Sequence, residues 1–197
     1  MKCTILMGSP NREGNTAALL KPFQEELAAL GVQWEMTWLY EQDILPCLGC
    51  KACQDVMDEF GCVRRDDVPR LYRAILDSDL ILFATPIYAW YCTAPMKAAM
   101  DRLIYAGCKY YGAQRGGSTL TGKRVATITT CGYRPDKGAD VWEEGLKRWC
   151  KHCGADYLGM FCHRDLGRKD EFMNPQTDAE VRGFARDLAA FVRDKDK

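Results

Sequence analysis

Met7-Gly8-Ser9-Pro10-Asn11-Arg12-Glu13-Gly14-Asn15-Thr16 is the stretch that decides the fold, and it directly follows the apolar run 3–6. The pattern predicts a buried first strand, then a loop rich in glycine, serine and asparagine, then a helix from about Thr16. Gly8 and Gly14 let the backbone turn without a Cβ clash, and the start of the helix presents unpaired N–H groups. Such a loop can hold a phosphate with little help from Lys or Arg.

Two well-known phosphate loops are excluded by this stretch. The dinucleotide pattern G-x-G-x-x-G is absent, and no Gly-Lys-Ser/Thr follows as a nucleoside triphosphate would require. The loop suits a phosphate monoester such as that of FMN. An ordinary strand-to-helix turn without a ligand is the alternative.

The bulk composition predicts a single domain spanning residues 1–197. The chain is 47% hydrophobic, and its 27 basic residues balance its 27 acidic ones. A net charge of zero gives no overall field that would draw the protein to nucleic acid or to a membrane. No apolar stretch is long enough to span a bilayer, and the first strand leaves no room for a leader, so we expect a cytoplasmic protein.

Five apolar segments alternate with five amphipathic ones along the chain. We expect strands at 3–6, 32–40, 79–84, 124–130 and 155–162, and helices at 16–30, 66–76, 94–105, 139–153 and 178–193. Thr177 and Glu180 predict a capping box for the last helix. This alternation predicts an α/β fold, a doubly wound parallel sheet with helices on both faces.

Ligands of such sheets bind at the carboxyl ends of the strands, where the loops 8–16, 85–91 and 130–135 should meet. The second of these loops carries Tyr88, Trp90 and Tyr91 beside a proline. A flavin needs a flat slot with an aromatic wall and a few backbone donors, which these loops provide. Core packing at a strand end is the alternative role for the aromatic residues. Because the redox chemistry of a flavin belongs to its ring, we expect no catalytic triad.

Four further segments lie outside the regular pattern. A cysteine-rich loop spans 46–63, and a glycine-rich loop spans 107–122, where a lid or an interface element is expected. The charged run 164–171 is expected to be a solvated loop, and the tail 193–197 a frayed end.

The chain resembles the flavodoxin-like, NADPH-dependent FMN reductase family, including its iron–sulfur flavoprotein branch. Four motifs in the family's order carry the resemblance over nearly the whole chain: Gly8-Ser9-Pro10 with Gly14-Asn15-Thr16, the cysteine segment 46–53 with 62–67, Thr85-Pro86-Ile87-Tyr88 leading to 94–97 and 101–102, and 122–124 opening a strand that ends in Cys131-Gly132. The resemblance implies a five-stranded sheet in the order 2-1-3-4-5.

The resemblance also implies an FMN site. The phosphate would be held by Ser9, Asn11, Gly14, Asn15 and Thr16, the isoalloxazine ring would lie along Pro86, Ile87, Tyr88, Ala89 and Trp90, and its other edge would meet Thr130, Cys131 and Gly132. The family usually has arginine directly after the proline of the first loop. Here that arginine is Arg12, one position later, which shifts its expected contact with the phosphate or with a nicotinamide cofactor.

The cysteine-rich loop contains Cys47-x2-Cys50-x2-Cys53, followed after eight residues by Cys62. Four thiolates at this spacing can converge on an iron–sulfur cluster or on zinc, and free thiols are the main alternative to the cluster, ahead of zinc. The resemblance implies a four-iron cluster, although the gap before the last cysteine tends to be shorter in that branch.

The other cysteines carry weaker signals. Cys150 and Cys153 fall on the apolar stripe of their helix, which favours small buried filler. A metal site that combines them with His152, Cys162 or His163 is the alternative. Cys3, Cys92 and Cys108 have no evident partners.

The function predicted from these features is an FMN-dependent oxidoreductase. Electrons would come from NAD(P)H or an iron–sulfur centre and pass to a quinone, a flavin, an oxygen species or a ferredoxin-like protein. The alternatives are a flavodoxin-type electron carrier, which the zero net charge disfavours, and a zinc- or thiol-based interaction module on the same fold. The resemblance further implies a homodimer or homotetramer, with 107–122 as the candidate contact.

Overall fold

The computed structural model describes residues 1–167 and 172–195. The prediction of a solvated loop at 164–171 therefore lies partly outside the described residues, and so does the prediction of a frayed end at 193–197.

The five strands form one parallel sheet in the order β2-β1-β3-β4-β5, which confirms the predicted fold class. Residues 80–85 of β3 are fully buried because helices cover both faces of the sheet, as the unbroken apolar run predicted. The strands are β1 (Lys2–Met7), β2 (Gln33–Trp38), β3 (Leu80–Pro86), β4 (Arg124–Cys131) and β5 (Asp156–Arg164).

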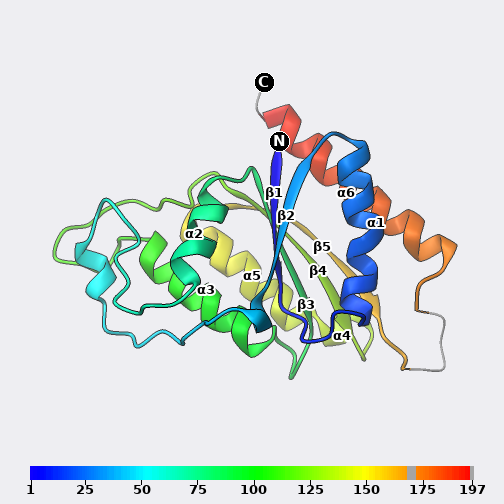
Figure 1. Ribbon diagram of the computed structural model, residues 1–197, viewed down its shortest axis with the longest axis horizontal. Helices are drawn as coiled ribbons and strands as arrows, with labels where there is room; N and C mark the ends of the chain where they lie inside the picture. Colours follow the sequence, from blue (N-terminus) through cyan, green and yellow to red (C-terminus); the bar gives the residue numbers. More distant parts are fainter. Residues whose placement is uncertain (168–171, 196–197) are drawn as a thin grey trace.

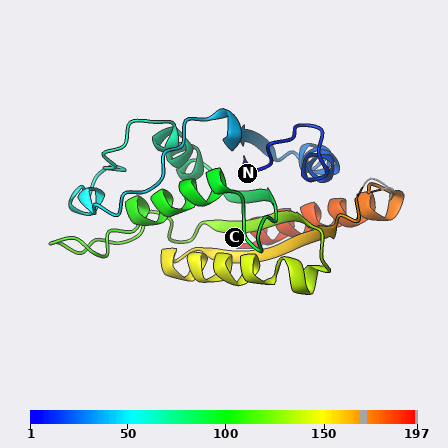
Figure 2. The same ribbon diagram turned by 90° about the horizontal axis from the view of Figure 1, so that it is seen from below.

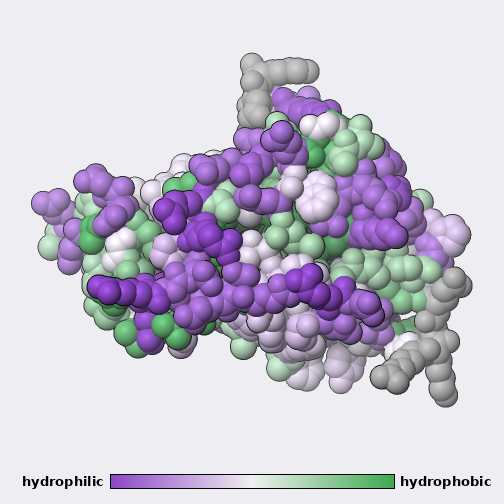
Figure 3. Space-filling model, viewed as in Figure 1, coloured by the Kyte–Doolittle hydropathy of each residue, from purple (hydrophilic) through white to green (hydrophobic). Residues whose placement is uncertain are grey.

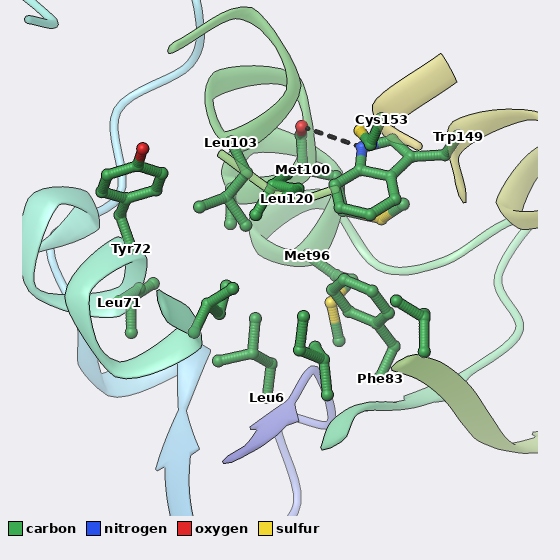
Figure 4. Close-up of a cluster of buried hydrophobic side chains, with 14 of the residues drawn as sticks. Leu6, Leu71, Tyr72, Phe83, Met96, Met100, Leu103, Leu120, Trp149 and Cys153 are labelled. Atoms are coloured by element: carbon green, nitrogen blue, oxygen red, sulfur yellow. Dashed lines mark hydrogen bonds between the residues drawn. The ribbon is translucent and has the colours of Figure 1, made fainter. Parts of the chain in front are cut away.

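Figures 1 and 2 show that the long helices cover the sheet from two sides. One side carries α1 (Asn15–Ala29) and α6 (Pro175–Lys195). The other carries α2 (Val68–Leu76), α3 (Ala94–Gly107) and α5 (Asp140–Cys153). Each layer has its own core cluster, and Figure 4 shows how Leu71 of α2, Leu103 of α3 and Trp149 of α5 pack on the side of the sheet that carries Leu6 and Phe83.

Two local predictions differ from the structure at helix starts. The last helix begins at Pro175, and the Asn174 side chain accepts the N–H of Thr177 at 2.9 Å. The predicted capping box at Thr177 is therefore wrong, because Asn174 caps the helix and proline suits its first turn. The short helix α4 (Pro135–Gly138) follows β4 and was not predicted.

The two long loops lie side by side at one end of the molecule (Figure 1). The cysteine-rich loop contains only the 3₁₀ turn η2 (Ala52–Asp55), and a second turn, η1 (Leu39–Glu41), precedes it. The glycine-rich loop folds back on itself, because Lys109 pairs with Gly116 and Gly117 through backbone hydrogen bonds. Figure 3 shows hydrophobic residues among hydrophilic ones at this end. Among the described residues, no helix is both long and apolar enough to cross a membrane.

Candidate functional site

The loop after β1 forms a compact cradle at the carboxyl edge of the sheet. The Ser9 hydroxyl accepts the N–H of Asn11 at 3.2 Å, and the Asn11 side-chain oxygen accepts the N–H of Glu13 at 3.0 Å. Helix α1 then begins after Gly14 without a side-chain cap and without an acidic residue in its first turn. The positive end of the helix dipole is left free to face an anion.

Two buried hydroxyls tie this cradle to its neighbours. The hydroxyls of Thr16 and Thr130 lie 2.9 Å apart and are almost fully buried, which joins the first turn of α1 to the end of β4. The Thr93 hydroxyl donates to the Gly8 carbonyl at 2.7 Å, and a Cβ on Gly8 would come within 2.9 Å of that hydroxyl. Glycine at position 8 therefore permits the close approach of the loop that follows β3.

The loop after β3 makes a tight turn with unusual backbone angles. Tyr88 and Tyr91 exchange two backbone hydrogen bonds, and between them Ala89 and Trp90 have φ of 48° and 63°. Two consecutive residues with positive φ, neither of them glycine, cost free energy that the surrounding structure must supply. Such strain is typical of binding sites, where a backbone is fixed for a ligand.

An aromatic pair joins the second and third loops. The rings of Trp90 and Tyr133 are stacked with centroids 5.9 Å apart and planes 16° from parallel, and the indole N–H of Trp90 donates to the Lys137 carbonyl at 3.2 Å. A cavity of about 140 Å³ opens beside the pair. Its lining comes from both loops and from α4: Ile87, Ala89, Trp90, Cys131, Gly132, Tyr133 and Gly138.

The structure thus brings together loops that are far apart in the sequence, as predicted.

Arg12, also predicted to contact the cofactor, instead contacts Glu41 and Trp38 in this structure. Its guanidinium donates to both carboxylate oxygens of Glu41, at 2.6 and 2.5 Å, and lies over the Trp38 ring. Tyr133 was not among the predicted contact residues, although an aromatic residue directly after Cys131-Gly132 was the available signal.

The four cysteines of the cysteine-rich loop line one small cavity, of about 70 Å³. Lys51 and Arg64 line the same cavity, and its apolar wall includes Leu48, Val63 and Tyr105. Within residues 1–167 and 172–195, no three Cys, His, Asp or Glu side chains lie close enough together to hold a metal ion. The sulfurs of Cys47, Cys50, Cys53 and Cys62 therefore share a cavity without adopting ligand geometry in this structure.

A buried ion pair fixes the two ends of this loop. The guanidinium of Arg102, on α3, donates to the Asp66 carboxylate and to the Leu45 carbonyl, and both charged side chains are almost completely excluded from solvent. Burial alone would raise the pKa of Asp66, but the hydrogen bonds from Arg102 and from two backbone amides lower it. The Nε and Nη2 atoms of Arg102 are buried without a hydrogen-bond partner, next to the thiol of Cys62.

Two more buried polar side chains hold the middle of the loop. The Lys109 ammonium donates to the carbonyls of Cys53, Glu59 and Phe60 at 2.8, 3.1 and 3.4 Å, and burial lowers its pKa. The Gln54 side chain bonds the chain around Tyr105 and the residues that follow it. Arg102, Lys109 and Gln54 were all missed from the sequence, because their burial depends on contacts across tens of residues.

The alternative metal site near the end of α5 is not assembled. Cys150 and Cys153 are buried in the core, as the apolar stripe predicted. The His152 ring stacks on Tyr111, and the His163 ring packs against Phe172. All eleven cysteines are free.

The parallel sheet in the order β2-β1-β3-β4-β5 is that of the flavodoxin-like class of proteins, and the family model described as NADPH-dependent FMN reductase matches residues 1–160. The chain is 32% identical over 187 residues to an iron-sulfur flavoprotein of Methanocaldococcus jannaschii, covering 86% of this chain and 95% of that one. It is 30% identical over 151 residues to an iron-sulfur flavoprotein of Archaeoglobus fulgidus, covering 76% of this chain but only 64% of the relative.

Solved structures show the same fold. An NAD(P)H:quinone oxidoreductase from Methanothermobacter marburgensis superposes with a TM-score of 0.73 at 20% identity, over 95% of this chain and 96% of that one. An FMN-dependent NADH-azoreductase from Bacillus anthracis, in complex with FMN, gives 0.71 at 18% identity, over 96% and 100%. The chain belongs to the NADPH-dependent FMN reductase family, on its iron–sulfur flavoprotein branch. The chain is therefore an oxidoreductase, and FMN is the flavin that the description of its family names.

Proposed function

We propose that this protein binds FMN at the carboxyl edge of the sheet and carries electrons from NAD(P)H to a small acceptor or a protein partner. The observation that supports the proposal is the 2.9 Å contact between the hydroxyls of Thr16 and Thr130. It joins the uncapped start of α1 to the end of β4, where the next residue, Cys131, lines the cavity beside Trp90 and Tyr133. FMN supplies the electron-transfer chemistry when bound. The chain's own residues bind and orient it.

Each part of this edge has a distinct task. The Ser9–Thr16 cradle holds the phosphate through backbone N–H groups, Asn15 and the Thr16 hydroxyl. The strained turn at Ala89 and Trp90 and the 130–132 segment hold the ring. The Trp90 and Tyr133 rings supply a flat apolar wall and limit the access of water.

Comparing FMN with riboflavin tests this assignment. Hydrogen bonds to a charged group contribute roughly 1.5–3 kcal/mol each, so the purified protein should bind FMN at least about 100-fold more tightly than riboflavin. Fluorescence quenching measures both affinities. Equal affinities, or no binding of either flavin, would contradict the proposal.

The cysteine cavity suits an anionic metal–thiolate centre, and we propose that it holds a four-iron cluster. Lys51 and Arg64 line the cavity, Arg102 and Lys109 are buried behind it, and two N–H groups of Arg102 lack acceptors beside Cys62. Neutral thiols would leave the unpaired N–H groups of Arg102 without an acceptor, whereas a cluster with four thiolate ligands would bring negative charge to them. When bound, the cluster supplies one-electron transfer, and Cys47, Cys50, Cys53 and Cys62 would hold it.

Iron and sulfide analysis of anaerobically purified protein tests the cluster. The wild type should contain about four irons per chain, and Cys62→Ser should lose most of them. Cys3→Ala is the matched control, because it removes a buried thiol from the other core cluster, away from Cys53 and Cys62. Stoichiometric zinc without iron would select the zinc alternative.

Partners and assembly complete the proposal. Leu48 and Val63 are 60% and 56% exposed at the cysteine cavity, which favours docking of a ferredoxin-like protein there. Quinones, free flavin and oxygen species are the candidate small acceptors.

A groove of about 420 Å³ between α3 and α5, bordered by Tyr111 of the glycine-rich loop, is the proposed contact of a homodimer or homotetramer. A monomer by light scattering would contradict that assembly. A cytoplasmic location stays a prediction.

A further inference from the structure

Two cysteines on neighbouring strands touch at the proposed flavin edge. Cys131 ends β4, and Cys162 lies on β5 opposite Thr129, two residues before Cys131. Because alternate residues of a strand share one face, both thiols lie on the same side of the sheet. Their sulfurs are 3.5 Å apart. A disulfide needs about 2.05 Å, so the sulfurs must approach by about 1.5 Å. Because the two cysteines are diagonal neighbours, this approach also requires the ends of β4 and β5 to shift toward each other.

The contacts around the pair give the two sulfurs different roles. The Cys131 thiol donates to the Tyr133 carbonyl at 3.1 Å, so its single proton is engaged and the Cys162 thiol is the donor between the two sulfurs. A Cβ on Gly138 would come within 3.0 Å of the Cys131 sulfur, so glycine leaves the space that this sulfur occupies.

The electrostatic surroundings of the two thiols also differ. Burial raises the pKa of both thiols, to about 12 for Cys162. For Cys131, the hydrogen bond from Cys162 and the charge of Arg164 oppose the rise. These two contributions make a thiolate on Cys131 less unfavourable than burial alone would, and the thiolate is the attacking form in disulfide chemistry.

One member of the pair, Cys131, also lines a cavity. Cys131 lines the space beside Trp90 and Tyr133, where the proposed function places the flavin ring, whereas Cys162 is only partly exposed behind it. None of the residues proposed to bind the cluster belongs to this pair. The proposed function uses Cys131 only as part of the segment that holds the flavin ring, and it gives the contact between the two sulfurs no role.

We propose that Cys131 and Cys162 form a reversible dithiol–disulfide couple beside the flavin, a second two-electron site of this protein. Formation of the Sγ–Sγ bond breaks both S–H bonds and releases two electrons and two protons, which oxidised FMN accepts. The reverse step reduces the disulfide at the expense of reduced FMN. The inference rests on the proposed function, because it requires FMN at this edge.

Peptide mapping tests the pair itself. The full chain is equilibrated anaerobically with mixtures of reduced and oxidised glutathione, free thiols are alkylated, and digests are analysed by mass spectrometry. The expected result is a linked peptide containing Cys131 and Cys162, two hydrogens lighter than the sum of its parts and lost on reduction. Cys162→Ser should abolish it, and Cys3→Ala should retain it. Persistence of both thiols under oxidising mixtures would overturn the inference.

Counting electrons tests the link to FMN. FMN-loaded protein is first oxidised with glutathione disulfide and then titrated anaerobically with dithionite. The wild type and Cys3→Ala should each accept two more electrons per chain than Cys162→Ser and Cys162→Ala. Any cluster adds the same number to all four proteins and cancels. If all four proteins accepted the same number of electrons, the proposed exchange of electrons between the thiol pair and FMN would be overturned. FMN retention, measured separately, distinguishes this failure from failure of the proposed function, because flavin-free protein would overturn both.

Discussion

The flavin edge and the cysteine-rich loop are held in place by different means. At the flavin edge, each loop continues a strand of the sheet, and short contacts such as Thr16 with Thr130 join neighbouring strand ends. The cysteine-rich loop has no strand and only one short turn. Buried charges from α3 and the segment after it, Arg102 and Lys109, hold the loop instead.

This difference has an energetic consequence. Backbone pairing distributes stability over many bonds, so a single substitution at the flavin edge should change ligand affinity more than folding. A loop held by a few buried charges concentrates its stability in those groups, since removing one partner leaves the other buried and uncompensated. Substitutions in the two regions should therefore differ in size and in readout.

The largest effect is expected at the buried ion pair. Arg102→Met leaves the Asp66 carboxylate buried without its cation and should lower the free energy of unfolding by about 3–5 kcal/mol. Urea denaturation measures the change. Adding Asp66→Asn should restore part of the loss, because it removes the uncompensated charge.

The exposed pair Lys97–Asp101 on the same helix provides the matched control. Lys97→Met should change the free energy of unfolding by no more than about 0.5 kcal/mol, because exposed pairs four residues apart contribute little. If both substitutions had equally small effects, the cysteine-rich loop would not depend on the buried pair.

The same pair predicts a dependence on acid. The pKa of Asp66 is lower in the folded protein than in the unfolded chain, so its contribution to stability is present above about pH 4. That contribution should be lost as the pH falls through the lowered folded pKa. Urea denaturation at pH 5, 4 and 3 should show a steeper loss for the wild type than for the Arg102→Met/Asp66→Asn double variant. Parallel curves would contradict the assignment.

The contrast also explains what the sequence could predict. The β1 loop and the apolar strands are local signals, and they predicted a doubly wound parallel sheet and the three converging loops. The strand order was implied by the family resemblance that the order of motifs carries. Arg102 and Lys109 look like ordinary charges within a helix and the loop after it. Their burial depends on packing against residues 36 to 57 positions away, which no local pattern records. The Asn174 cap was missed because a nearby Thr-x-x-Glu gave a competing signal.

A smaller and more local effect is expected at Lys109. Lys109→Met removes the donor of three carbonyls and should cost about 1–3 kcal/mol. Hydrogen exchange should accelerate mainly in residues 46–63, with the strands remaining protected. Uniform acceleration across the sheet would show that the loop and the sheet unfold as one unit.

At the flavin edge, Thr16→Val should affect binding more than folding. Loss of one hydroxyl donor to the phosphate should weaken FMN binding about tenfold, and Thr16→Ser should retain most of the affinity. Flavin fluorescence titration measures both variants. Riboflavin serves as the control ligand, because its affinity should not respond to a phosphate contact. A parallel loss for riboflavin would place Thr16 outside the phosphate cradle.

The smallest effect is a gain in stability at the strained turn. Ala89 has a φ of 48°, which costs an alanine about 1–2 kcal/mol, whereas glycine adopts this angle freely but loses more entropy on folding. Ala89→Gly should therefore raise the free energy of unfolding by about 0.5–1 kcal/mol, as measured by urea denaturation.

Ala98→Gly, in the middle of α3, should lower the free energy of unfolding by about 1 kcal/mol, because helical angles give glycine no advantage. The opposite signs test whether Ala89 is strained, since a loss at both positions would mean that the turn relaxes in solution. The turn at the flavin edge would then adopt its final backbone angles only when the ligand binds. The two regions would differ in that the flavin edge is ordered by its ligand, whereas the cysteine-rich loop is ordered by buried charges before any ligand binds.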